Sequence, residues 1–120
     1  MPQRYSTILV VEDDADIREV TAEVLRDAGC PEVVEVGDGA EALTKLDDLK
    51  CPCLIVLDLV MPRMDGLEFL ARMRKHRRAR DFSVVVMTAR AEPTTVPGVL
   101  GVLRKPFDVE KLVSLLGKAA

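Results

Sequence analysis

The sequence predicts an α/β fold in which a doubly wound, five-stranded parallel sheet carries helices on both faces. Short apolar runs rich in β-branched residues alternate along the chain with segments in which apolar residues recur every three or four positions. This alternation is typical of strand–helix units that build a parallel sheet. At 120 residues the chain is long enough to bury one core without cross-links. We therefore expect a single domain over residues 1–120.

The predicted strands differ in how deeply they should be buried. The runs Thr7–Val11 and Leu54–Leu57 are almost continuously apolar, which is the pattern of strands covered on both faces. The run Glu32–Val36 is shorter and more polar, so we expect it near an edge of the sheet. The remaining predicted strands are Phe82–Met87 and Val99–Leu103.

Helices are predicted between these strands. The first should start at a capping Asp14 or Asp16 and end at Gly29. Aspartate accepts hydrogen bonds from the free N–H groups of a first turn, and glycine permits the backbone conformation that ends a helix. The second helix is predicted over Ala40–Leu49, and the third follows Gly66.

The fourth helix is predicted to be short or irregular. Pro93 and Pro97 both fall within residues 90–101, and a proline inside a helix costs about 3 kcal/mol. A last helix is predicted over residues 108–117, where apolar residues again recur at helical spacing.

Composition argues against several function classes. A net charge of −3 and an aromatic content of 3% disfavour direct binding to nucleic acid or to anionic membranes. No apolar stretch approaches the ~20 residues of a membrane span, and the N-terminus lacks the apolar core of a signal peptide. Three cysteines, an odd number, do not make a disulfide framework. We therefore expect a cytoplasmic protein.

A basic run from Arg72 to Arg80 has two interpretations. Its cations either complement the dipole at the end of the third helix, solvated on the outside, or form a docking patch for an acidic partner. The acidic net charge and the lack of a DNA-binding motif favour the first interpretation.

Residues able to bind a cation or a phosphoryl group follow four of the predicted strands: Glu12, Asp13, Asp58, Thr88 and Lys105. The carboxyl ends of parallel strands meet at one edge, where open α/β sheets bind ligands. Clustered carboxylates repel one another, and a hard cation such as Mg²⁺ relieves this repulsion and leaves positions for a phosphoryl oxygen. The pattern predicts phosphoryl transfer with Asp58 as nucleophile, although any one of these acids alone would more often be a cap or a solvated loop residue.

Four motifs make the chain resemble a response-regulator receiver domain, the CheY-like phosphoacceptor domain of two-component signalling. In order they are ILVVEDD, LIVLDLVMPRMDG, VVVMTA and LRKPF, and the resemblance covers essentially the whole chain. It implies a flavodoxin-like (βα)5 fold and a signalling domain that catalyses only its own phosphorylation and dephosphorylation. It also implies a histidine kinase or phosphotransfer protein as phosphodonor, small acyl phosphates as substitutes, and an unidentified downstream protein or effector domain.

The resemblance further implies a site for Mg²⁺ or Mn²⁺. Asp58 matches the phosphorylated aspartate and a metal ligand, Asp13 matches a direct ligand, and Glu12 matches an acid that acts through water. Val60 matches the position whose backbone carbonyl binds the metal, and its side chain would flank the phosphoryl group.

Other matched positions concern the phosphoryl group and its readout. Thr88 matches the switch Ser/Thr that follows the phosphoryl group, and Lys105 matches the lysine that pairs with it. Ala89 and Arg90 would flank the phosphoryl site. Val102 stands where many members carry an aromatic switch residue, so the usual coupled motion of threonine and ring is not available in that form.

Other function classes fit less well. A pseudo-receiver would share the fold but bind proteins without a phosphorylation switch, which the intact acids argue against. An aspartyl-phosphate hydrolase of the resembling type would need a second acid two residues after Asp58, where this chain has Val60. A dinucleotide or flavin site would need a glycine-rich loop after the first strand. We expect a monomer or weak dimer.

Overall fold

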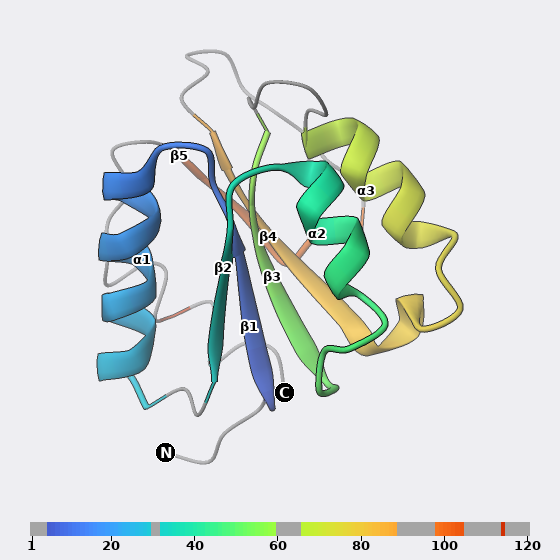
Figure 1. The fold of residues 1–120 in the computed structure, drawn as a ribbon, viewed down its shortest axis with the longest axis horizontal. Coiled ribbons are helices and arrows are strands. Elements are labelled where there is room, and N and C mark those ends of the chain that lie inside the picture. The colour runs from blue at the N-terminus through green and yellow to red at the C-terminus, as the bar shows by residue number, and fades with distance from the viewer. Residues whose placement is uncertain (1–4, 30–31, 60–65, 89–97, 105–113, 115–120) are drawn as a thin grey trace.

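Five parallel strands form one sheet in the order β2-β1-β3-β4-β5 (Figure 1). The computed structural model describes residues 5–29, 32–59, 66–88, 98–104 and 114. The strands are β1 (Thr7–Val11), β2 (Val33–Val36), β3 (Cys53–Asp58), β4 (Phe82–Thr88) and β5 (Gly101–Arg104). The predicted doubly wound parallel sheet is confirmed, with β3 at its centre and β2 at an edge.

Three α-helices and a short 3₁₀ helix flank the described strands: α1 (Ala15–Asp27), α2 (Gly39–Lys45), α3 (Gly66–Arg74) and η1 (Ala79–Asp81). Asp14 caps α1, because its Oδ1 accepts hydrogen bonds from the N–H groups of Asp16 (2.9 Å) and Ile17 (3.2 Å). Asp38 caps α2 in the same way through the N–H of Glu41 (2.8 Å). Local capping therefore sets where these helices begin.

The second helix is shorter than the sequence predicted. It ends at Lys45 rather than at Leu49. The N–H of Leu46 donates to Leu43 three residues back (3.3 Å), which tightens the last turn. Leu46 and Leu49 nevertheless stay buried, so the apolar spacing identified the core residues correctly but not the end of the helix.

The helices divide between the two faces of the sheet, with α1 on one face and α2 and α3 on the other (Figure 1). The strand residues alternate in the same way: Leu54 and Val56 belong to the core cluster that includes Leu25 of α1, whereas Ile55 belongs to the cluster that includes Phe69 of α3. Burial of apolar side chains on both faces is the main term that holds the layers together.

The final strand and the segments around it complete the described fold. β5 begins at Gly101, two residues later than predicted, and the N–H of Leu100 donates to the carbonyl of Val84 just before it (2.8 Å). The predictions for a short fourth helix and for a helix over 108–117 fall almost wholly on residues 89–97, 105–113 and 115–120, outside the described part of the chain. None of the described helices is long and apolar enough to cross a membrane.

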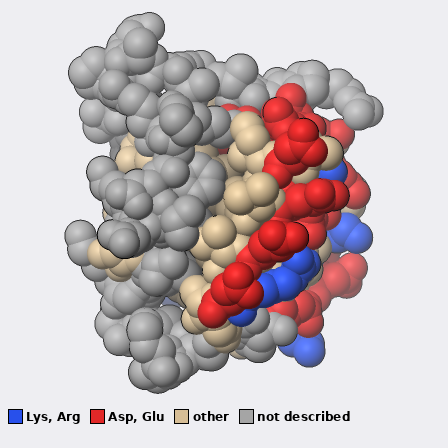
Figure 2. All heavy atoms as spheres, turned by 90° about the vertical axis from the view of Figure 1, so that its left-hand side faces the viewer, with Lys and Arg blue, Asp and Glu red and all other residues tan. Residues whose placement is uncertain are grey.

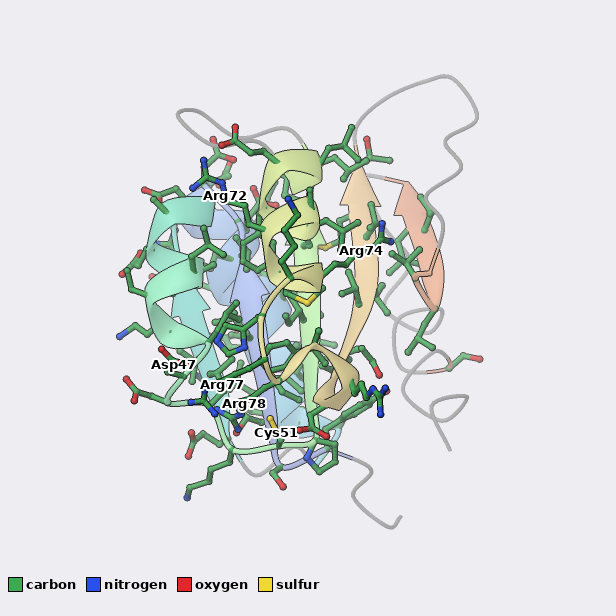
Figure 3. The ribbon with its side chains drawn as sticks, turned by 90° about the vertical axis from the view of Figure 1, so that its right-hand side faces the viewer. Asp47, Cys51, Arg72, Arg74, Arg77 and Arg78 are labelled. Atoms are coloured by element: carbon green, nitrogen blue, oxygen red, sulfur yellow. The ribbon has the colours of Figure 1, made fainter. Side chains whose placement is uncertain are left out.

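Part of the basic run at the end of α3 connects this segment to the chain that follows α2 (Figure 3). Arg78 donates to the carbonyl oxygens of Leu46 (3.0 Å), Asp47 (2.8 Å) and Leu49 (2.5 Å) and lies 2.8 Å from Cys51 Sγ. For Arg78, the interpretation as a solvated cation at the end of its own helix is wrong, because it binds the carbonyls that follow α2.

Exposed members of the same run form ordinary ion pairs. Arg77 lies 3.3 Å from Asp47, and Arg72 lies 3.0 Å from Glu68 one turn earlier in α3. The His76 ring also bonds Asp47 (2.9 Å), and this hydrogen bond is the main cause of the lowered pKa of the Asp47 carboxyl. These contacts pair several members of the run with acids of the same chain, which weakens the interpretation as a docking patch.

Cys53 provides a pH-dependent test of the core. Burial at the start of β3 raises the pKa of its thiol to about 12, against about 8.5 for an exposed cysteine. Between those values the unfolded chain loses a proton that the folded chain keeps, so stability falls as pH rises. Between pH 7 and pH 10, we expect the free energy of unfolding of the wild type to fall by about 1–2 kcal/mol more than that of Cys53→Val. Urea unfolding at the two pH values measures the difference. An identical pH dependence in both proteins would contradict the burial argument.

Candidate functional site

Three neighbouring strands deliver polar side chains to the carboxyl edge of the sheet. Glu12 and Asp13 follow β1, Asp58 is the last residue of β3, and Thr88 is the last residue of β4. Glu12, Asp58 and Thr88 are buried, with at most 2% of each exposed, whereas Asp13 is exposed. The predicted convergence of these residues on one edge is therefore found.

The three acids at this edge form a compact donor set. One carboxylate oxygen each from Glu12, Asp13 and Asp58 lies within 4.8 Å of the others. Two oxygens on opposite sides of a magnesium ion would be about 4.2 Å apart, given bonds of about 2.1 Å. An all-oxygen set of this charge and spacing fits a hard divalent cation, and it leaves room for water and a phosphoryl oxygen in the remaining positions.

Glu12 is held in place by hydrogen bonds at several atoms. Its N–H donates to the carbonyl of Val36 (3.1 Å), its Oε2 accepts from the N–H of Asp14 (3.2 Å), and its carbonyl accepts from Arg18 Nη1 (2.9 Å). A fully buried carboxylate is costly unless it is hydrogen-bonded. These bonds explain how the chain keeps this acid beside two others.

Gly66 allows the start of α3 to pass close to the main chain of Asp58. A Cβ at this position would lie 2.5 Å from the Asp58 carbonyl oxygen and 2.6 Å from Leu59 Cα. The Gly66 N–H donates to the Leu59 carbonyl (2.9 Å), so α3 begins directly against the end of β3. Only glycine permits this approach, which explains the residue that closes the sequence motif after Asp58.

We expect Gly66→Ala to lower the free energy of unfolding by about 2 kcal/mol, because the backbone at Asp58 must move to admit the methyl group. Urea unfolding measures the loss. Gly37→Ala is the matched control, since its Cβ would lie 3.4 Å from Arg18 Nη1, at ordinary contact distance. Equal stabilities of the two variants would show that the close approach at Gly66 does not constrain the site.

The remaining predicted residues divide into two groups. Val102 lies in β5 opposite Val86 and packs against the core cluster on the α2 and α3 face. It is therefore a partly buried residue at the margin of the core, two positions from the register partner of Thr88. The others lie outside the described residues: Val60, Ala89, Arg90 and Lys105.

Sequence reasoning missed Arg18. This residue lies in the first half of α1, is partly buried and contacts the main chain of Glu12. In the sequence, Arg18 stands among the acids of α1 and has the pattern of an ordinary surface residue. Only the packing of α1 against β1 and β2 shows its contact with Glu12.

The chain matches a known family along most of its length. The family model for the response regulator receiver domain matches residues 8–117. The chain is 37% identical over 111 residues to the transcriptional regulatory protein PdtaR of Mycobacterium tuberculosis, covering 88% of this chain and 52% of that protein. It is 36% identical over 112 residues to the phosphate regulon transcriptional regulatory protein PhoB of Escherichia coli, covering 89% and 48%. The chain thus spans about half the length of these curated relatives.

Solved structures agree with this match. The chemotaxis response regulator CheY4 of Vibrio cholerae superposes with a TM-score of 0.83 at 31% identity, covering 96% of this chain and 98% of that one. The response regulator TrrA of Thermotoga maritima, in complex with Mg²⁺–BeF, gives a TM-score of 0.82 at 29% identity, covering 96% and 99%.

A parallel sheet with an acidic cluster at its carboxyl edge places this chain among α/β domains with a candidate cation site at that edge. This chain belongs to the response regulator receiver domain family, the phosphoacceptor domains of two-component systems. Its role is therefore in signalling rather than in turnover of a separate substrate, and the pseudo-receiver alternative is not favoured.

Proposed function

We propose that Asp58 accepts a phosphoryl group in a reaction assisted by Mg²⁺ or Mn²⁺, and that residues 1–120 act as one domain. The observation that carries this proposal is the grouping of three carboxylate oxygens within 4.8 Å, one of them from the strand-terminal Asp58. Close carboxylates repel one another, and a cation bound between them would relieve this repulsion.

The proposed chemistry is an in-line displacement at phosphorus. A carboxylate oxygen of Asp58 forms the new O–P bond while the donor's P–N or P–O bond breaks. The electron pair leaves with the donor's imidazole or carboxylate, which suits a phosphohistidine of a kinase or phosphotransfer protein or a small acyl phosphate. Attack by water on the aspartyl phosphate then returns Asp58 and inorganic phosphate, so the domain catalyses only its own phosphorylation and dephosphorylation.

The proposed ligand set uses residues from the ends of two strands. Asp13 and Asp58 would bind the cation directly, Glu12 would bind through water, and the backbone carbonyl of Val60 would complete the protein ligands. A cation held there would neutralise charge on the phosphoryl oxygens. The hydrogen bonds that fix Glu12 support its role as a rigid part of this set.

Thr88 and Lys105 are proposed to bind the other phosphoryl oxygens. The buried Thr88 ends the strand next to the one that carries Asp58, and Lys105 follows the neighbouring strand in sequence. Val102 would transmit the change through its packing against the core, and Ala89 and Arg90 would flank the site.

The proposed partners are a histidine kinase or phosphotransfer protein and a downstream protein or effector domain. We propose a monomer or weak dimer, with no direct contact of this domain to nucleic acid or membrane. The prevalence of acidic side chains on the described surface around α1 supports the absence of contact with nucleic acid or anionic membranes, since such a surface repels phosphate groups (Figure 2).

Incubation with acetyl phosphate and Mg²⁺, followed by intact mass measurement, tests the proposed function. We expect the mass of one added phosphoryl group, and none when EDTA removes the metal. Asp13→Asn should sharply reduce the added mass at limiting Mg²⁺, because it removes a direct ligand. Phosphorylation that proceeds equally well in EDTA would overturn the metal-assisted mechanism.

A further inference from the structure

We propose that Arg18 is a positioning residue that orients the Glu12–Asp13 pair toward the cation. Its Nη1 donates to the Glu12 carbonyl oxygen (2.9 Å), and its Nε lies 3.8 Å from Glu35 Oε1 on β2. The side chain is only 23% exposed. One guanidinium thus links α1 to the end of β1 and to β2, and the inference rests on the metal site proposed above.

The Glu12 carbonyl matters because it belongs to the peptide unit that leads into Asp13. That unit is planar, so the direction of the carbonyl fixes the plane from which the Asp13 side chain projects. Within the described part of the chain, the Asp13 carboxylate accepts no hydrogen bond. The direction of its Cα–Cβ bond, from which the carboxylate projects, is set by the main chain, which the Val36 carbonyl holds on one side of Glu12 and Arg18 on the other.

Arg26 provides an internal comparison on the same helix. The two arginines are the cations of α1, whose other charged side chains are acidic (Figure 2). Both pair with Glu35: Arg26 Nη2 lies 3.2 Å from Oε2, the oxygen that Arg18 does not face. Arg26 also approaches the Val33 carbonyl at 3.4 Å. Of the two, Arg18 is the one that bonds Glu12.

Charge and position make opposite predictions for Arg18. A positive charge that contacts the main chain of Glu12 disfavours a cation bound nearby, so removal of the charge alone should tighten metal binding. If Arg18 orients the ligand pair, its removal should instead weaken binding. Loss of groups that orient metal ligands typically costs about 10-fold or more in affinity.

The test measures Mn²⁺ affinity by electron paramagnetic resonance in the wild type, Arg18→Gln and Arg26→Gln. Both variants lose one charge and one contact to Glu35. We expect Arg18→Gln to raise the Mn²⁺ dissociation constant about tenfold, and Arg26→Gln to leave it within about twofold, as expected for an exposed pair. Phosphorylation of Arg18→Gln by acetyl phosphate should recover the wild-type rate at saturating Mg²⁺.

The outcomes separate the two proposals. Absence of Mn²⁺ binding by the wild type would overturn the proposed function itself. Wild-type binding with unchanged or tighter binding by Arg18→Gln would overturn only the role of Arg18. Thermal unfolding of all three proteins guards against a folding defect: a variant with a lower melting temperature but wild-type Mn²⁺ affinity would assign Arg18 a purely structural role.

Discussion

Asp58→Asn should abolish phosphorylation by acetyl phosphate while leaving the protein folded. An amide has the shape of the carboxylate but not its nucleophilic oxygen, so the O–P bond cannot form. Removal of one of three clustered charges relieves repulsion, so stability should not fall. Intact mass after incubation with Mg²⁺ measures the loss, and urea unfolding measures the stability.

Asp48→Asn is the matched control for this substitution. Asp48 is an exposed aspartate in the turn that follows α2, before the amino end of β3. The two variants make the same chemical change, one at the carboxyl end of β3 and one before its amino end. Asp48→Asn should accept the phosphoryl group as the wild type does, and wild-type acceptance by Asp58→Asn would place the phosphoacceptor elsewhere.

Arg78→Ala should lower the free energy of unfolding by about 3 kcal/mol. The substitution removes the donors for three main-chain carbonyls and the contact with Cys51 Sγ. The bonds to Leu46 and Leu49 are part-buried, and a buried acceptor left unsatisfied costs about 1–3 kcal/mol. It also removes a guanidinium 6.0 Å from the centre of the Phe82 ring. Urea unfolding at neutral pH measures the change.

Arg77→Ala separates the role of Arg78 from that of charge. Arg77 is the adjacent residue, its side chain is 72% exposed, and its ion pair with Asp47 is a surface pair, for which a loss of at most about 1 kcal/mol is expected. Arg78→Lys keeps the charge, but one ammonium group cannot reach all the carbonyls. Its free energy of unfolding should therefore fall by most of the amount expected for Arg78→Ala. Equal stability of the Arg77 and Arg78 alanine variants would contradict the described role of Arg78.

Periodicity and strand composition were enough to predict the sheet. The continuous apolar runs of β1 and β3 are buried on both faces, and acids placed directly after them had to meet at one edge of a parallel sheet. This is why Glu12, Asp13 and Asp58 could be grouped before any geometry was known. The capping role of Asp14 was likewise predictable, because it depends on neighbours in sequence.

Contacts between elements could not be predicted in this way. The side chain of Arg78 bonds carbonyls 29 to 32 residues earlier in the chain, and no local pattern indicates such partners. Arg18 and Gly66 gain their roles from the packing of α1 and α3 against strand ends. The end of α2 was also missed, since a tighter final turn leaves the apolar spacing unchanged.

Locating the phosphoryl group tests the central claim most directly. The protein is incubated with acetyl phosphate and Mg²⁺, digested at low pH with pepsin and analysed by peptide mass. We predict that the added phosphoryl mass lies on the peptide that contains Asp58. Phosphoryl mass on a peptide that lacks Asp58, or an unmodified Asp58 peptide from a protein that binds the metal, would contradict the assignment of Asp58 as the phosphoacceptor.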